Sequence, residues 1–126
     1  MDRVQRSDDH TFAWTDLHGG RGAIAVRRYF EGSVPWPVEV ETWEIPVGGS
    51  EGVHRHDAAD PDLYAGTREC YLVVDGTGRF TLGPDVVDVG PGDGVLVDPQ
   101  TDRGLVNTGD HPLRLVALRD PPAASP

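Results

Sequence analysis

The stretch that decides the fold is Gly48-Gly49-Ser50-Glu51-Gly52-Val53-His54-Arg55-His56. Its last three residues have strand-like spacing, and in a β-strand successive side chains point to opposite faces. His54 and His56 therefore fall on one face, and Arg55 points the other way. If that face is interior, both imidazoles enter the core of the domain, where such a pair gives a weak indication of a metal site.

Short apolar runs bounded by Gly, Pro or Asp surround this stretch, and each one predicts a strand. The runs are Gly22–Phe30, Val38–Ile45, Cys70–Val74, Gly78–Leu82, Val86–Val89, Gly94–Val97 and Leu113–Leu118. Asp75-Gly76 predicts a hairpin, and Gly83-Pro84 predicts a further turn. No window has the pattern of a capped amphipathic helix. The sequence therefore predicts an all-β sandwich or barrel, with a jelly roll among the candidates.

The length of 126 residues suits one domain, residues 1–126, with flexible ends at about 1–10 and 120–126. The net charge of −10 disfavours nucleic acid and anionic lipid as partners. No stretch approaches the ~18 apolar residues of a membrane-spanning helix, so we expect a soluble, cytoplasmic protein. Cys70 is the only cysteine, so any metal must be bound by histidine and carboxylate.

Glu69 is the acidic residue that opens the next strongly apolar strand. A buried carboxylate at that position would need a partner, and a cation is one such partner. Alternatively, Glu69 is solvated, or it pairs with an arginine.

Together these residues resemble the cupin family. The chain is similar to the family's first motif, G-x5-H-x-H-x3/4-E-x6-G, at Gly48, His54, His56, Glu69 and Gly76. Residues 91–109 resemble the second motif, G-x5-P-x-G-x2-H-x3-N, at Gly92 and Asn107. The resemblance implies a double-stranded β-helix, which is a jelly-roll barrel. It further implies a small-molecule ligand, a homodimer, and a divalent metal ion (Zn, Fe, Mn or Ni) bound by His54, His56 and Glu69.

The chain departs from the first motif by an insertion, because Asp57 to Arg68 separate the second histidine from the glutamate. One interpretation is a lid that excludes water, with Tyr64 or an aspartate reaching the substrate. The other is a solvated acidic loop.

The chain also departs from the second motif, because Arg103 occupies the position of the family's fourth ligand, a histidine, and Gln100 that of a glycine. Arginine has no lone pair to donate to a metal. In one alternative, His54, His56 and Glu69 hold the metal, and Arg103 binds an oxyanion of the substrate. In the other, Arg103 pairs with Glu69, its charge replaces the metal, and the pocket is metal-free.

These residues predict a metal-dependent enzyme that acts on a small, oxygen-bearing, anionic metabolite in a biosynthetic pathway. The metal would act as a Lewis acid in isomerase, cyclase or lyase chemistry, with Glu69, Arg103 and Tyr64 as catalytic residues. The alternatives are a non-catalytic module that binds a small acid or sugar, and a non-haem iron oxygenase. We expect His10 and His18 at the surface, unless the N-terminal arm folds over the barrel and brings one of them near the pocket.

Overall fold

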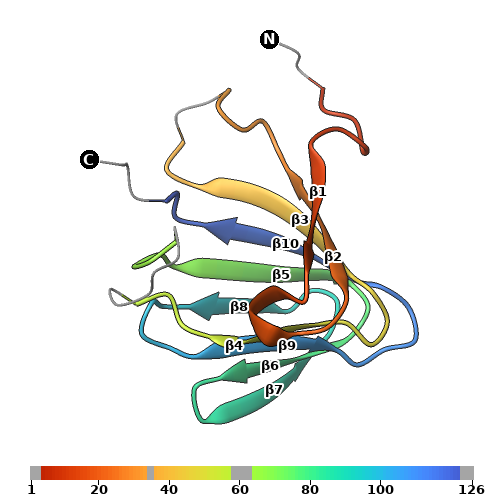
Figure 1. Ribbon diagram of the computed structural model, residues 1–126, viewed down its shortest axis with the longest axis vertical. Helices are drawn as coiled ribbons and strands as arrows, with labels where there is room; N and C mark the ends of the chain where they lie inside the picture. Colours follow the sequence, from red (N-terminus) through yellow and green to blue (C-terminus); the bar gives the residue numbers. More distant parts are fainter. Residues whose placement is uncertain (1–3, 34–35, 58–63, 123–126) are drawn as a thin grey trace.

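The computed structural model describes residues 4–33, 36–57 and 64–122, and it is almost entirely β (Figure 1). The strands are β1 Thr11–Thr15, β2 Ala23–Arg28, β3 Glu39–Ile45, β4 Ser50–His54, β5 Glu69–Asp75, β6 Gly78–Leu82, β7 Asp85–Val89, β8 Gly94–Val97, β9 Arg103–Asn107 and β10 Leu113–Arg119. Every strand predicted from an apolar run is present. Three more strands, β1, β4 and β9, join them.

The strands form two antiparallel sheets, in the orders β1-β2-β3-β10-β5-β8 and β4-β9-β6-β7. In Figure 1 the larger sheet lies above the smaller one and curves toward it, so the two enclose one interior. The predicted double-stranded β-helix is therefore confirmed.

The hairpin predicted at Asp75-Gly76 is wrong. This turn joins β5, which pairs with β10 and β8, to β6, which pairs with β7 and β9 in the other sheet. The local sequence allows a tight turn, but the two strands are already paired on both sides with other partners. Gly76 has φ 86°, and a Cβ there would lie 2.9 Å from the carbonyl oxygen of Pro112. The hairpin lies instead at Gly83-Pro84, where Leu82 pairs with Asp85.

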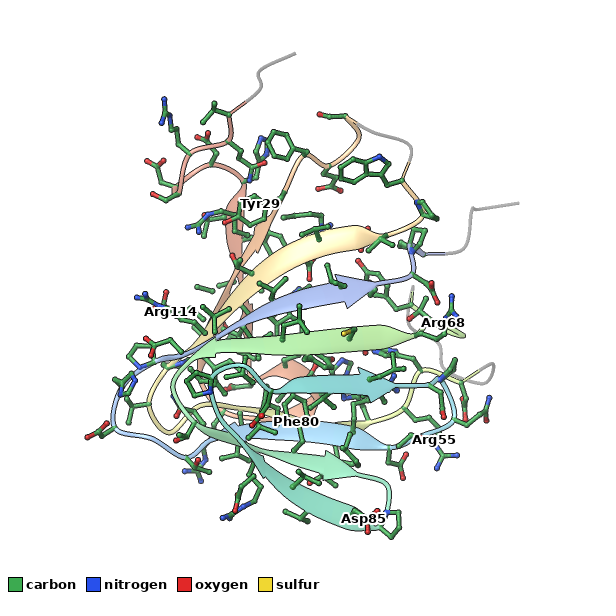
Figure 2. All side chains as sticks on the ribbon, turned by 180° about the vertical axis from the view of Figure 1, so that it is seen from behind. Tyr29, Arg55, Arg68, Phe80, Asp85 and Arg114 are labelled. Carbon is green, nitrogen blue, oxygen red and sulfur yellow. The ribbon has the colours of Figure 1, made fainter. Side chains whose placement is uncertain are left out.

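The interior has two chemically different ends. The apolar end is formed by buried side chains that include Ile45, Val73, Phe80, Leu105, Leu113 and Leu115. The polar end is formed by buried polar and charged side chains, namely Glu41, Glu51, His56, Glu69, Arg103 and Arg119. Strand register produces this division, because antiparallel pairing sets Arg119 opposite Glu69 and Leu115 opposite Val73. In Figure 2, Phe80 lies between the sheets, while Arg55 and Arg68 mark the rim at the polar end.

The remaining segments are short. Leu17–Gly19 forms a single 3-10 turn, η1, and no helix in the described part of the chain is long and apolar enough to cross a membrane. The side chain of Gln5 donates to the carbonyl oxygen of Arg28 (2.8 Å) and accepts from the backbone N–H of Phe30 (2.8 Å). Residues 58–63 of the insertion and the outermost parts of both predicted flexible ends lie outside the described residues.

Candidate functional site

A β-bulge in β4 sets the inner wall of the site. Glu51 pairs with Leu105 and His54 pairs with Arg103, so two residues of β4 stand opposite one residue of β9. A bulge lets side chains three positions apart face the same side, which a regular strand does not allow. Glu51 and His54 can therefore both face the polar end.

His54 and His56 lie close together, with 3.2 Å between their Nε2 atoms. His54 Nδ1 is 2.9 Å from the carbonyl oxygen of Gly52. A carbonyl can only accept, so Nδ1 carries the proton and the lone pair of Nε2 faces His56. Burial lowers the pKa of His54 to about 4, so the ring is neutral at neutral pH. This is the protonation state that a metal ligand needs.

His18 in η1 brings a third imidazole to this pair. Its ring stacks on that of His54, with 3.7 Å between the centroids and 12° between the planes. Ring nitrogens of His18, His54 and His56 all lie within 4.8 Å of one another. The N-terminal arm therefore does fold over the barrel, and the side chain of His18 is only 25% exposed. His10 is at the surface, as expected.

The turn that carries His18 sits directly on β4 (Figure 1). Arg21 and Ser50 exchange two backbone hydrogen bonds of 3.0 and 2.8 Å. A Cβ on Gly20 would overlap the carbonyl oxygen of Ser50, and one on Gly52 would overlap that of His18. Glycine at both positions thus permits the close approach that stacks His18 on His54.

Glu69 lies on the other side of His56 and is bound by several groups. Its Oε1 is 3.4 Å from His56 Nε2 and 3.5 Å from Arg103 Nη2. Its Oε2 accepts a 2.8 Å hydrogen bond from the hydroxyl of Tyr71, whose pKa is raised well above its usual range by burial. The structure thus brings together three residues that the sequence singled out: His56, Glu69 and Arg103.

Arg103 is fully buried and contacts Glu69. Its Nη2 donates to the carbonyl oxygen of Asp98 (3.3 Å), while Nε and Nη1 have no hydrogen-bond acceptor among the described residues.

Glu51 is a second buried carboxylate, which the sequence analysis missed. It is 5% exposed, and its Oε2 lies 3.7 Å from His54 Nε2 and 4.0 Å from His18 Nε2. Burial raises the pKa of Glu51 well above its usual range, and the negative charge of Glu69 raises it further. In a regular strand Glu51 and His54 would face opposite sides, so no sequence pattern places them together.

A cavity of about 230 Å³ opens beside these groups. It is lined by Trp14, Leu17, His18, Trp43, Glu51, His56, Tyr64, Glu69 and Arg119. Arg103 is not among the lining residues, so it reaches the cavity only through its contact with Glu69.

Tyr64 and Arg119 contribute a second part of the cavity lining. The guanidinium of Arg119 lies over the ring of Tyr64, 4.3 Å from its centroid, and pairs with the buried carboxylate of Glu41. The hydroxyl of Tyr64 donates to Glu39 Oε1 (2.9 Å), and burial raises its pKa to about 12. Tyr64, predicted as a residue that reaches the substrate, therefore does line the cavity. Arg119 and Trp14 had no distinguishing pattern in the sequence.

Comparison with known proteins agrees with this architecture. An uncharacterised protein of Methanocaldococcus jannaschii is 28% identical over 78 residues, which is 62% of this chain and 56% of the relative. The chain thus matches little more than half the length of that relative. Among solved structures, a predicted oxalate decarboxylase from Thermotoga maritima is similar, with a TM-score of 0.77, 23% identity, and coverage of 93% of this chain and 97% of that one. The polyketide cyclase RemF from Streptomyces resistomycificus has a TM-score of 0.73 and 18% identity, covering 95% of this chain and 79% of its own.

A family model described as the cupin domain matches residues 41–119, which include every strand from β4 to β10 and both predicted motifs. The matched range contains His54, His56 and Glu69, which lie around one polar interior. The chain therefore belongs to the cupin family.

Proposed function

We propose that this protein is a metal-dependent enzyme that acts on a small, oxygen-bearing, anionic metabolite in the cavity at the polar end of the barrel. The observation that carries the proposal is the cluster of His18, His54 and His56 beside a cavity that also contains two buried carboxylates. Imidazole and carboxylate are the usual donors for Zn²⁺ and for non-haem Fe²⁺.

The residues fit a divalent ion. Metal–nitrogen bonds of about 2.0–2.1 Å in tetrahedral geometry place two ligand nitrogens roughly 3.3 Å apart. The Nε2 atoms of His54 and His56 are 3.2 Å apart, and the hydrogen bond to Gly52 directs the lone pair of His54 into the cluster. A bound ion would supply a Lewis acid that polarises an oxygen of the substrate.

The other lining residues suit a small anion. Pockets for drug-sized ligands are about 300–1,000 Å³, so a cavity of about 230 Å³ suits a metabolite of few atoms. Arg119 Nε has no hydrogen-bond acceptor among the described residues and would donate to an anionic group of the substrate. Tyr64 would orient that group, and Glu69 Oε1, which receives no hydrogen bond from the described residues, would accept a proton. Arg103 would position Glu69.

Two similar structures support this reaction class. One is described as a predicted oxalate decarboxylase and the other as a polyketide cyclase, which are names for enzymes of oxygen-rich molecules. Lyase and cyclase chemistry on such a molecule is therefore our leading assignment. An iron oxygenase would use the same ligands, and the identity of the bound metal separates the two.

A metal-free module that binds a small acid or sugar is the second candidate. Arg103 Nη2 lies 3.5 Å from Glu69 Oε1, so the guanidinium already offsets one carboxylate charge that a metal would otherwise balance. The metal-dependent enzyme and the metal-free module differ in one measurable property, which is whether the protein binds a divalent metal in a stoichiometric amount.

Metal analysis tests the proposal. Protein purified without chelator should contain close to one equivalent of a divalent metal, and His54→Ala and His56→Ala should each remove it while the fold is retained. His111→Ala is the matched control. The side chain of His111 is exposed, and its ion-pair contacts are Asp75 and Asp110, neither of which belongs to the cluster. A wild-type protein that takes up no divalent metal even after incubation with Zn²⁺, Fe²⁺, Mn²⁺ and Ni²⁺ would favour the metal-free module. The homodimer implied by the family stays a prediction, which light scattering would test.

A further inference from the structure

We propose that the metal centre of this chain is built from His18, Glu51, His54 and His56, and that Glu69 is kept off the metal. The inference rests on the proposed function, because it concerns the same metal. It differs from the ligand set implied by the family motifs, in which Glu69 and a histidine at position 103 complete the centre.

The second motif lacks its histidine ligand in this chain. Arg103 cannot donate a lone pair, so the second motif contributes no ligand here. An imidazole nevertheless reaches the cluster from a different element, because η1 stacks His18 on His54 with 3.7 Å between the ring centroids. The N-terminal turn thus supplies the third imidazole in place of β9.

The two carboxylates beside the imidazoles have different neighbours. Glu69 Oε1 lies 3.5 Å from Arg103 Nη2 and 3.4 Å from His56 Nε2, and Glu69 Oε2 accepts a 2.8 Å hydrogen bond from the hydroxyl of Tyr71. A cation on Glu69 would lie close to that guanidinium and would be repelled by it. Glu69 is thus already neutralised and oriented without a metal.

Glu51 has the opposite surroundings. It is 5% exposed, and within the described part of the chain its only ion-pair contacts are the imidazoles of His18 and His54. No arginine among the described residues lies within ion-pair distance of Glu51, and a divalent ion among those same imidazoles would supply the close cation that it lacks. Glu51 is therefore the carboxylate that the metal would bind.

Backbone contacts hold η1, which carries His18, against β4. The paired backbone hydrogen bonds of Arg21 and Ser50, and the close approaches at Gly20 and Gly52, fix the turn on β4. Side chains that act as ligands bind best when the surrounding shell orients them beforehand. Docking of the turn should therefore control metal affinity even when all four ligands are present.

A matched pair of isosteric variants tests the carboxylate assignment. Zn²⁺ and Co²⁺ are titrated by calorimetry into chelator-stripped full-length protein carrying Glu51→Gln or Glu69→Gln. Loss of an outer-shell partner typically weakens metal binding by about 10–100-fold, so loss of a direct ligand should reach or exceed about 100-fold. We expect that loss for Glu51→Gln and a loss of about 10-fold or less for Glu69→Gln, because Glu69 contacts the ligand His56 and not the metal. The reverse order would overturn the inference and leave the proposed function standing.

A second pair tests the turn. His18→Ala should weaken Zn²⁺ and Co²⁺ binding by about 100-fold, and Gly20→Ala should also weaken it, although Gly20→Ala keeps every ligand. Gly90→Ala is the control, because a Cβ at Gly90 would meet nothing within 4 Å. Circular dichroism confirms that each variant is folded. Unchanged affinity in His18→Ala, together with loss in His54→Ala, would overturn the inference. A wild-type protein that binds neither metal would instead refute the proposed function itself.

Discussion

At the apolar end of the barrel the inward side chains of β3, β9 and β10 include Ile45, Leu105 and Leu115, whereas at the polar end the same strands contribute Glu41, Arg103 and Arg119. Antiparallel pairing is common to both ends. The difference lies in which side chains the register, including the bulge in β4, brings together.

The two ends contribute differently to the stability of the fold. Full burial of one large apolar side chain contributes about 1.5–3 kcal/mol, so the apolar end provides the driving force for folding. Buried charges oppose folding unless they are paired, and those at the polar end contribute little net stability. The apolar end thus supplies most of the stability, and the polar end contributes the groups that can bind a ligand.

The largest expected effect is at the apolar end. Phe80 is fully buried, and its ring centroid lies 5.3 Å from that of Tyr71. Phe80→Ala should lower the free energy of unfolding by about 3–5 kcal/mol, because it leaves a cavity in the core. Urea unfolding of chelator-stripped protein measures this change. Metal affinity measured well below the unfolding transition should stay within a few-fold, and a loss of under about 1 kcal/mol would contradict the division.

The next largest effect is expected when a substitution breaks a charge pair at the polar end. Arg103→Ala should destabilise the metal-free protein by about 3 kcal/mol, because Glu69 then keeps a buried charge without its guanidinium. Adding Glu69→Gln should recover much of that loss, which a double-mutant cycle in urea would reveal. The control is Arg55→Ala, because Arg55 is on the outside with a side chain 44% exposed, and we expect no measurable change in stability. Equal changes in the free energy of unfolding for Arg103→Ala and Arg55→Ala would show that the Arg103–Glu69 pair does not contribute to stability.

The smallest effect is a contrast between two histidines in chelator-stripped protein. Burial lowers the pKa of His54 to about 4 from 6.5, so the unfolded chain binds more protons between these values. Stability should therefore fall as pH drops through that window. His111 behaves oppositely, because hydrogen bonds to Asp110 and Asp75 raise its pKa above 6.5. The stability that it contributes is present below pH 6.5 and is lost as pH rises through its folded pKa.

Proton NMR titration of the two imidazoles checks both directions. His54→Ala should flatten the acid limb of the stability curve, and His111→Ala should change only the limb near neutral pH. The same titration curve for His54 and His111 would contradict the expected opposite pKa shifts of the buried and the exposed imidazole.

The sequence predicted those parts of the molecule in which apolar residues face the core. The strands found from apolar runs all have inward Val, Leu, Ile or aromatic side chains. β4 could not be found in this way, because its one large apolar residue, Val53, is 58% exposed while Glu51 is buried. β9 is similar, since it begins at Arg103 and ends at Asn107, and both are buried.

The residues of the candidate site likewise fall into those that a local sequence pattern predicts and those that it does not. Alternation alone places His54 and His56 on one face, and they lie together in the structure. His18 required knowledge of how a distant turn docks, and Glu51 required a bulge, so neither was accessible from local pattern. The motif residue Asn107, by contrast, has a structural role, because its Nδ2 donates to the carbonyl oxygens of Ile45, Pro46 and His111.

The docking of η1 on β4 also decides which segment of the chain could be transferred to another protein with a complete cavity. The family match starts at Glu41, yet Trp14, Leu17 and His18, three of the nine residues that line the cavity, precede it. A chain trimmed or recombined at that boundary would have β3 as an unprotected edge, open to pairing with other chains, and a cavity lacking one wall. The smallest segment that could be moved between proteins with its cavity complete therefore starts at β1, well before Glu41, where the family match begins.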